Sequence, residues 1–443
     1  MSAYKSHVMN KLILLALTLC VSVFQSFAQY TIPPKMEWWY HDRFGMFIHF
    51  GSYSQYAKGE WIMQIEKWSK QDYQTKITSH FNPSNFDAKA IVAAAKSTGM
   101  KYIVITAKHH EGFCMWKTDV QGFKDYTGSR IFDLYHYLDF ERDILMELKQ
   151  ECDAQGIKFC LYYSILDWNH SSQTLKDYFS EMKSMEAKAE YVEQMKAQLR
   201  ELITRYNPAV LWFDGDWCTN ETPATLDNWW NKDDAIDLYN YLLSIDPNII
   251  VNERVKRELG LGDFMCPEQK IPDAPLERQW ETCQTMNGTW GYNAQSYNSY
   301  NPAHTFIHEL ELIVSRDGNY LLNIDPLPDG SLNPNMLKVL EEIGTWMQIY
   351  GESIYGCTRS PFAEQPSWGV YTQKQGILYA HVQSIPETKK IFVPCNAKKI
   401  DSVYELSDKK TTVKYTKTKE GIQIQLPNTQ AHPCSSVIAI EFY

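Results

Sequence analysis

The chain has 443 residues, more than one hydrophobic core usually supports, so we expect a large domain followed by a smaller one. Its 43 basic and 53 acidic residues give a formal net charge of -10, and the sequence has no cluster of Lys and Arg of the kind that follows a phosphate backbone. Nucleic acid is therefore not an expected partner. Aromatic residues make up 14% of the chain, which fits either a large core or platforms for stacking sugar rings.

The N-terminus has the pattern of a secretory signal peptide, predicted to occupy residues 1–28. Lys5 and Lys11 precede an apolar run from Leu12 to Phe24, and a small-x-small cleavage pattern follows at its end. The run is shorter than the roughly 20 residues that a membrane-spanning helix needs, and no later segment is long and apolar enough. We therefore expect an exported protein, periplasmic or secreted, with no membrane span.

The ten cysteines are dispersed and have no metal-type CxxC spacing. Lipid anchoring at Cys20 is the less favoured alternative to secretion, because Leu19 stands where a bacterial lipidation site normally has a small residue. A single isolated disulfide, such as one between Cys266 and Cys283, is an alternative that the sequence leaves open.

Strand-like and helical segments alternate between residues 29 and 355. The predicted strands are Gly45–His49, Tyr102–Lys108, Lys158–Ser164, Ala209–Asp214 and Ile249–Glu253, with less regular candidates at Asp263–Glu268, Trp280–Cys283 and Tyr320–Ile324. The predicted helices are Ala88–Thr98, Phe140–Gln155, Tyr191–Tyr206 and Pro334–Tyr350. This alternation predicts parallel strands with right-handed crossovers, and at this length a closed (β/α)8-like barrel is favoured over an open doubly wound sheet.

The pattern changes after about residue 356. Short alternating segments separated by turn residues replace the helices, at Gly369–Thr372, Ile377–Val382, Lys390–Val393, Ile422–Gln425 and Ser436–Phe442. We therefore expect residues 356–443 to form a small antiparallel β-sandwich, which gives an α/β barrel domain at 29–355 followed by a β-sandwich domain.

Asp214 is the strongest candidate for chemistry. It ends the apolar run Ala209–Phe213 and precedes a glycine, so its carboxylate is expected at the rim of a buried strand. Catalytic groups collect at the carboxyl ends of barrel strands, and a carboxylate beside aromatic residues suits a glycoside hydrolase. Asp216, beyond the glycine, is the alternative, although an acid there is more often a solvated turn residue.

Three histidines lie at the ends of the first two predicted strands: His49 ends the first, and His109 and His110 come at the end of the second. Barrel rims gather functional side chains, which favours a joint role over a structural one. A metal site is the competing interpretation. Because neighbouring residues of a strand point to opposite sides, His109 and His110 could bind one ion only if the strand has already ended.

The chain resembles α-L-fucosidases of glycoside hydrolase family 29. The motifs that carry the resemblance are Trp38-Trp39, Phe44–Gly51, Gly59–Trp61, Thr106–Phe113, Leu161–Ser164, Leu211–Trp217, Val251–Arg254 and Asn319–Gly330. The resemblance implies a retaining, exo-acting enzyme that releases terminal fucose from glycans, with no cofactor, and a barrel followed by a β-sandwich. Asp214 matches the catalytic nucleophile, and further matched positions contribute to binding the fucose ring: His49, Glu60, Trp61, His109, His110, Tyr163 and Arg254.

The acid/base residue is less sharply defined by the resemblance. Glu268, in the segment Gly262–Glu268, is the preferred candidate, and Glu281 is the runner-up, which could instead orient other side chains. Two alternatives to the enzyme stay open, a catalytically silent carbohydrate-binding relative and a metal-dependent hydrolase that uses the rim histidines. The sequence leaves the fucosyl linkage, the natural glycan and the oligomeric state undecided.

Overall fold

A computed structural model describes residues 31–176, 179–427 and 432–443, and residues 35–443 form one compact unit. The predicted signal peptide lies outside the described residues. Within this unit, the strands of the first sheet are β1 (Phe44–Ile48), β2 (Tyr102–Lys108), β3 (Lys158–Ser164), β6 (Val210–Asp214), β7 (Ile250–Val251), β8 (Trp280–Thr285) and β9 (Gly318–Ile324). All their pairings are parallel, in the order β7-β6-β3-β2-β1-β9-β8.

The sheet curls into a barrel, and a short segment connects its two edges. Phe264 pairs with Asn252 beyond β7, while Met265 pairs with Trp280 of β8, both as isolated parallel bridges. Asp263–Glu268 is one of the less regular strand candidates of the sequence. Pro267 has no N–H for a ladder, and this segment forms only isolated bridges. The expected (β/α)8-like barrel is thus confirmed, with this irregular segment in the place of one strand.

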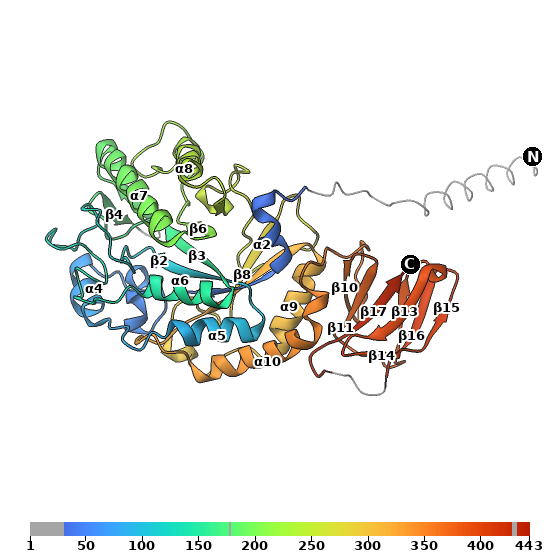
Figure 1. Ribbon diagram of the computed structural model, residues 1–443. Coiled ribbons are helices and arrows are strands. Elements are labelled where there is room, and N and C mark those ends of the chain that lie inside the picture. Colours follow the sequence, from blue (N-terminus) through green and yellow to red (C-terminus); the bar gives the residue numbers. More distant parts are fainter. Residues whose placement is uncertain (1–30, 177–178, 428–431) are drawn as a thin grey trace, which may run out of the picture. The chain divides into compact units, whose positions relative to one another are not determined.

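Helices lie outside the sheet, and Figure 1 shows α5, α6 and α10 side by side there. The α-helices of the described residues are α2 (Glu37–Asp42), α3 (Ile62–Ile65), α4 (Lys70–Lys76), α5 (Ala88–Thr98), α6 (Ile144–Gln155), α7 (Met185–Tyr206), α8 (Lys232–Ile245), α9 (Ala303–Ser315) and α10 (Pro334–Tyr350). Side-chain caps fix several starts: Asp87 accepts from Ala90 N at the start of α5, and Asp143 delays the start of α6 to Ile144, past the predicted Phe140.

One hairpin between β3 and α7 has no counterpart among the predicted elements. It consists of β4 (Gln173–Lys176) and β5 (Phe179–Met182), which pair in antiparallel fashion. Helix α8 was likewise not among the predicted elements.

The C-terminal strands form two antiparallel sheets. The strands are β10 (Gly369–Lys374), β11 (Ile377–Val382), β12 (Lys390–Pro394), β13 (Ile400–Glu405), β14 (Asp408–Thr412), β15 (Tyr415–Lys417), β16 (Gly421–Gln425) and β17 (Ser436–Phe442). Among the described residues, the sheet orders are β10-β11-β17-β13-β14 and β12-β16-β15. Apolar side chains of both sheets share one core, which confirms the expected β-sandwich.

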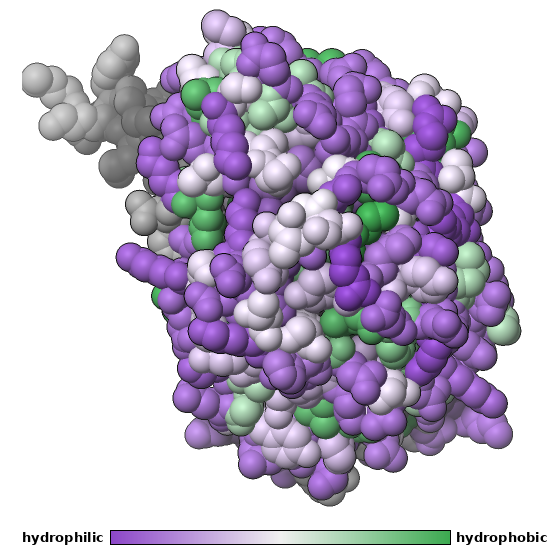
Figure 2. Space-filling view, turned by 90° about the vertical axis from the view of Figure 1, so that its left-hand side faces the viewer, coloured by the Kyte–Doolittle hydropathy of each residue, from purple (hydrophilic) through white to green (hydrophobic). Residues whose placement is uncertain are grey.

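Side chains of β11 alternate between the two faces of the larger sheet, and each face packs against a different part of the protein. Leu378 and Ala380 belong to the sandwich core, whereas Tyr379 packs into the main core and His381 lies 3.0 Å from Glu311 of α9. On the side of the molecule drawn in Figure 2, hydrophilic residues predominate and apolar ones lie in small separate groups. Among the described residues, we find no helix whose length and hydropathy would suit a membrane span.

Candidate active site

A small cavity of about 170 Å³ lies where the barrel strands end. This is below the roughly 300–1,000 Å³ of most ligand pockets, so the cavity suits a small ligand. Its lining combines aromatic and ionisable side chains: Phe47, His49, Trp61, His109, His110, Tyr162, Trp212, Asp214, Trp217, Arg254, Glu268, Cys283 and Trp290. Five of the seven predicted binding residues line this cavity, together with Asp214 and Glu268.

Asp214 is the last residue of β6 and lines this cavity. Gly215 follows with a φ of +84°, and a Cβ there would come within 2.7 Å of Leu166 N, so the sharp turn that presents the carboxylate requires glycine. Oδ1 of Asp214 lies 3.1 Å from Arg254 and 3.2 Å from Arg257. Burial by itself raises the pKa of Asp214, but the surrounding positive charge, Arg254 first, outweighs it and holds the pKa well below its usual value.

Arg254 connects the two candidate catalytic carboxylates. Its Nη1 donates to Asp214, and its Nη2 donates to Oε2 of Glu268 at 2.8 Å. The guanidinium also lies 4.5 Å from the centroid of the Trp212 ring. Arg254 is buried, whereas 41% of the Glu268 side chain is exposed. One acid therefore lies deep in the cavity, and the other lies at its mouth with access to solvent.

All three predicted histidines reach the cavity. β2 ends at Lys108, so His109 and His110 are past the strand and both rings line the same space, with centroids 4.1 Å apart. Burial lowers the pKa of His49 to about 3, and burial also lowers the pKa of His110 well below its usual value. Nδ1 of His109 lies 3.6 Å from Oε2 of Glu111.

Aromatic rings form the walls. Trp61 and Trp217 lie with ring centroids 5.4 Å apart, and the ring of His110 lies 5.2 Å from Trp61. Tyr162 stacks on Trp212 with ring centroids 5.6 Å apart and donates a hydrogen bond of 3.3 Å to Oδ2 of Asp214. A flat apolar wall beside several polar groups is the arrangement that binds a small sugar.

Tyr163, expected in the site, does not line the cavity, and its neighbour Tyr162 does. Successive residues of β3 point to opposite faces, and the register pairs Tyr162 with Trp212 and Tyr163 with Phe213. The hydroxyl of Tyr163 donates to Gln198 of α7 at 2.8 Å, on the outer face of the sheet. The prediction for Tyr163 is corrected to Tyr162.

Two glutamates of the predicted site lie outside the cavity lining. Glu281, the runner-up acid, is buried and accepts hydrogen bonds from Trp39, Tyr102 and Trp212, so donors already engage both of its oxygens. Burial raises the pKa of Glu281 to about 7, against these hydrogen bonds. Glu60 is also buried and accepts from the backbone N–H of Gly291 at 2.8 Å.

Asp216 is not a solvated turn residue, contrary to expectation. It is buried, with 1% exposed, and accepts hydrogen bonds from both the backbone N–H and the guanidinium of Arg257. Because Arg257 also contacts Asp214, Asp216 helps to place a positive charge beside the deeper candidate carboxylate.

Among the described residues, no group of three or more His, Cys, Asp or Glu side chains is arranged to hold a metal ion. Cys266 and Cys283 are both free thiols.

A second cavity of about 640 Å³ adjoins the first, since Trp217 lines both. The β4–β5 hairpin and the loop after β6 form it, and the exposed ring of Phe179 belongs to its lining. It also contains three acidic residues, Glu181, Glu221 and Asp227, and one basic residue, Lys176.

Several lining residues were not identified from the sequence. Trp212 lies two residues before Asp214, and the alternation of β6 would have placed both on one face. Trp217 lies in a loop after β6, and Trp290 lies in a loop after β8. No periodicity indicates where a loop side chain points.

Comparison with known proteins gives a consistent result. The model of the alpha-L-fucosidase family matches residues 24–352. An alpha-L-fucosidase of Dictyostelium discoideum is 28% identical over 434 residues, which cover 89% of this chain and 87% of that protein.

Two solved structures are similar over nearly the whole chain. Alpha-L-fucosidase isoenzyme 1 from Paenibacillus thiaminolyticus has 31% identity and a TM-score of 0.79, covering 93% of this chain and 99% of that one. A GH29 alpha-L-fucosidase from Bacteroides thetaiotaomicron, described as a trapped covalent intermediate with 2-fluoro-fucosyl fluoride, has 25% identity and a TM-score of 0.81, covering 94% and 99%.

Proposed function

Because the chain belongs to the alpha-L-fucosidase family of glycoside hydrolases, we propose that it is a retaining, exo-acting α-L-fucosidase with Asp214 as nucleophile and Glu268 as acid/base residue. The observation that carries the proposal is that both carboxylates line one small cavity and share Arg254. Retaining glycosidases use two carboxyl groups in this way, one on each side of the scissile bond.

In the first step, an Asp214 oxygen attacks the anomeric carbon while the bond from that carbon to the glycosidic oxygen breaks. The proton of the Glu268 carboxyl goes to the departing oxygen, so the leaving glycan departs as an alcohol. Asp214 suits the nucleophilic role because the positive charges beside it keep its carboxylate ionised.

In the second step, Glu268 as a carboxylate takes a proton from water, and the water oxygen attacks the anomeric carbon and releases Asp214. The ester on Asp214 has no charge, so Arg254 is then left to stabilise the negative charge of Glu268, the form that activates water. Two displacements at one carbon return it to its original configuration.

The cavity fits a terminal fucosyl group. Its histidines and Tyr162 supply polar groups for the sugar hydroxyls, and the tryptophans supply a wall for the methyl group. Its size supports release of one terminal sugar. The larger cavity beyond Trp217 offers space for the leaving part of a fucosylated oligosaccharide.

Both catalytic positions are filled, which favours an enzyme over a silent carbohydrate-binding relative. Export of the enzyme is part of the proposal and rests on the sequence pattern of residues 1–28 alone.

The proposal is tested by incubating the purified protein with an aryl α-L-fucoside in an NMR tube and following the anomers of free fucose from the first seconds. We expect the α anomer to form first and to mutarotate afterwards, with unchanged rates after treatment with a chelator. Initial release of the β anomer would contradict retention, and no release from aryl fucosides or from a panel of fucosylated oligosaccharides would contradict the activity.

A further inference from the structure

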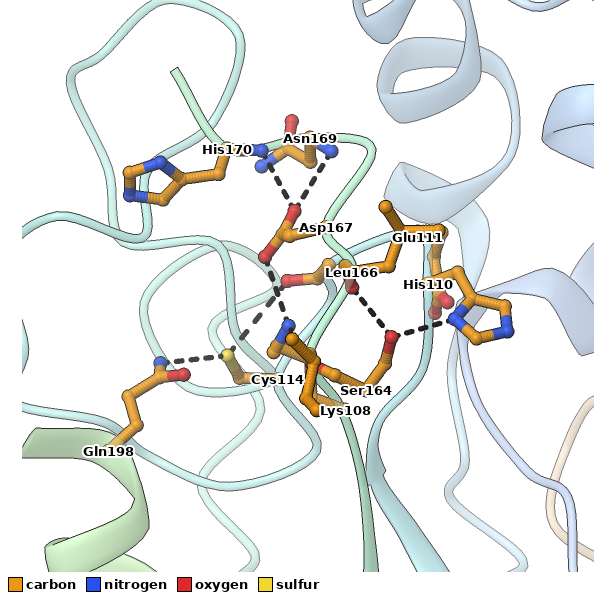
Figure 3. Close-up of polar contacts among 12 residues, drawn as sticks. Lys108, His110, Glu111, Cys114, Ser164, Leu166, Asp167, Asn169, His170 and Gln198 are labelled. Carbon is orange, nitrogen blue, oxygen red and sulfur yellow. Dashed lines mark hydrogen bonds and ion pairs between the residues drawn. The ribbon is translucent and has the colours of Figure 1, made fainter. Parts of the chain in front are cut away.

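The hydroxyl of Ser164 determines which nitrogen of His110 carries the proton. Oγ of Ser164 lies 2.6 Å from the carbonyl oxygen of Leu166 and 2.7 Å from Nδ1 of His110, and Figure 3 shows these two contacts in a row. A carbonyl oxygen has no hydrogen, so the one hydrogen of the serine must point to Leu166. Nδ1 of His110 must therefore be the donor to Ser164.

The backbone around Ser164 is held from the other side by a buried ion pair. Nζ of Lys108 donates to the carbonyl oxygen of Ser164 at 2.9 Å and lies 3.2 Å from Asp167. Both charged residues are almost completely buried, and Asp167 also accepts from the N–H groups of Asn169 and His170 (Figure 3). The Ser164 hydroxyl is thus fixed in place relative to His110.

Asn323 likewise determines which nitrogen of His49 carries the proton. Its Nδ2 donates to the carbonyl oxygen of Trp290 at 2.8 Å, which requires that the amide oxygen faces His49. Oδ1 of Asn323 lies 2.7 Å from Nδ1 of His49, so this nitrogen also carries the proton.

We propose that Ser164 and Asn323 are positioning residues that present His110 and His49 to the sugar as hydrogen-bond acceptors. With Nδ1 protonated, each neutral imidazole has a lone pair on Nε2. This inference rests on the proposed function in naming the ligand, since each Nε2 would accept from a different hydroxyl of the fucosyl group.

The surroundings of Nε2 of His110 support this role. This atom is buried and has no hydrogen-bond partner among the described residues, and it lies 3.7 Å from Oδ2 of Asp214. Two acceptors therefore face each other across a gap. Burial also keeps His110 and His49 uncharged. A sugar hydroxyl that donates to Nε2 would satisfy an otherwise unpaired buried nitrogen.

The direct test is long-range proton–nitrogen NMR of the histidine rings in the unmodified protein, which needs no variant. We expect a protonated Nδ1 and a bare Nε2 for both His110 and His49 near neutral pH. A protonated Nε2 in either ring overturns the proposal for that ring, whether or not the protein cleaves fucosides.

The functional test compares Ser164→Ala with Ser353→Ala, a buried control serine whose hydroxyl also bonds a backbone carbonyl, that of Tyr350. We expect Ser164→Ala to lower kcat/KM for an aryl α-L-fucoside about tenfold, and Ser353→Ala to leave it unchanged.

A series of 2-, 3- and 4-deoxy fucosides then separates positioning from general damage. The loss in Ser164→Ala should disappear for the one deoxy sugar that lacks the hydroxyl bound by His110, and the loss in Asn323→Ala should disappear for a different one. Equal losses on every sugar of the series would show a structural role only and overturn the proposal.

Discussion

Nη1 of Arg254 lies 3.1 Å from Oδ1 of Asp214, in a position where only 3% of the arginine side chain is exposed. A buried ion pair of this kind is costly to break from one side, because the remaining charge loses its partner. Here the remaining charge would be the proposed nucleophile. The Arg254–Asp214 ion pair therefore keeps the proposed nucleophile in its ionised, active form.

Arg254→Met should raise the pKa of Asp214 and so move the acid limb of the kcat/KM profile to higher pH. The carboxylate is the active form, and its pKa is depressed, so activity in the wild type persists as pH falls and is lost only below the depressed value. We also expect kcat/KM to fall at least about 100-fold at neutral pH. Arg257→Met is the control: its side chain is 31% exposed, so solvent screens its charge and the shift should be smaller. An acid limb that stays in place in Arg254→Met would contradict this account.

Glu268→Ala should separate substrates by their leaving groups. An oligosaccharide needs a proton on its departing oxygen, and we expect a loss of about 10²- to 10⁴-fold. An aryl fucoside with an acidic phenol needs little proton donation and should lose far less in the bond-breaking step. The test is to measure kcat/KM of Glu268→Ala on both substrates. Equal losses would contradict the assignment of Glu268 as the acid/base residue and favour Glu281.

Tyr162→Phe and Tyr163→Phe remove one hydroxyl each from neighbouring residues of β3. We expect Tyr162→Phe to lower kcat/KM roughly tenfold, because it removes the 3.3 Å hydrogen bond to Asp214. Tyr163→Phe should keep kcat/KM and lower the free energy of unfolding by about 1–3 kcal/mol, since the buried Gln198 loses its donor. Steady-state rates measure kcat/KM and urea titrations measure the free energy of unfolding of both variants. A loss of kcat/KM in Tyr163→Phe but not in Tyr162→Phe would show that Tyr163, not Tyr162, belongs to the site.

Strand ends could be predicted from the sequence because the physical signal is local. β2 and β3 have the predicted bounds, and Asp214 ends β6 as expected, since buried parallel strands are continuous apolar runs that stop at polar residues. Which of two neighbouring tyrosines faces the cavity depends instead on the register with β6. A single strand does not reveal that register.

Long-range contacts account for the other differences. Asp216 and Glu281 are both candidate catalytic acids in the sequence, yet both bind other side chains of the protein. Asp216 accepts a hydrogen bond from Arg257, and Glu281 accepts hydrogen bonds from donors inside the barrel. The second cavity is formed by the β4–β5 hairpin and a loop. Such arrangements arise from packing between distant segments and leave no periodic pattern in the sequence.

Glu281 should make stability depend on pH. Its pKa is about 7 in the native protein and near 4.5 when unfolded, so between these values the native state keeps a proton that the unfolded chain releases. Raising the pH through this window therefore destabilises the wild type. In Glu281→Gln this contribution is absent, so the unfolding free energy of the wild type relative to the variant should fall by about 3 kcal/mol between about pH 4.5 and pH 8. Denaturant titrations at several pH values measure the difference, and a constant difference would contradict the raised pKa.

The central claim, that Asp214 becomes bonded to the sugar, is tested most directly by mass spectrometry after incubation with a 2-deoxy-2-fluoro-fucosyl fluoride. The fluorine at C2 slows both steps, while fluoride departs without needing a proton, so the ester should accumulate. We expect the intact protein to gain the mass of one fluorofucosyl group and peptide mapping to place it on Asp214. Label on Asp216 or on Glu268, or turnover of fucosides by a protein that never acquires label, would contradict the account.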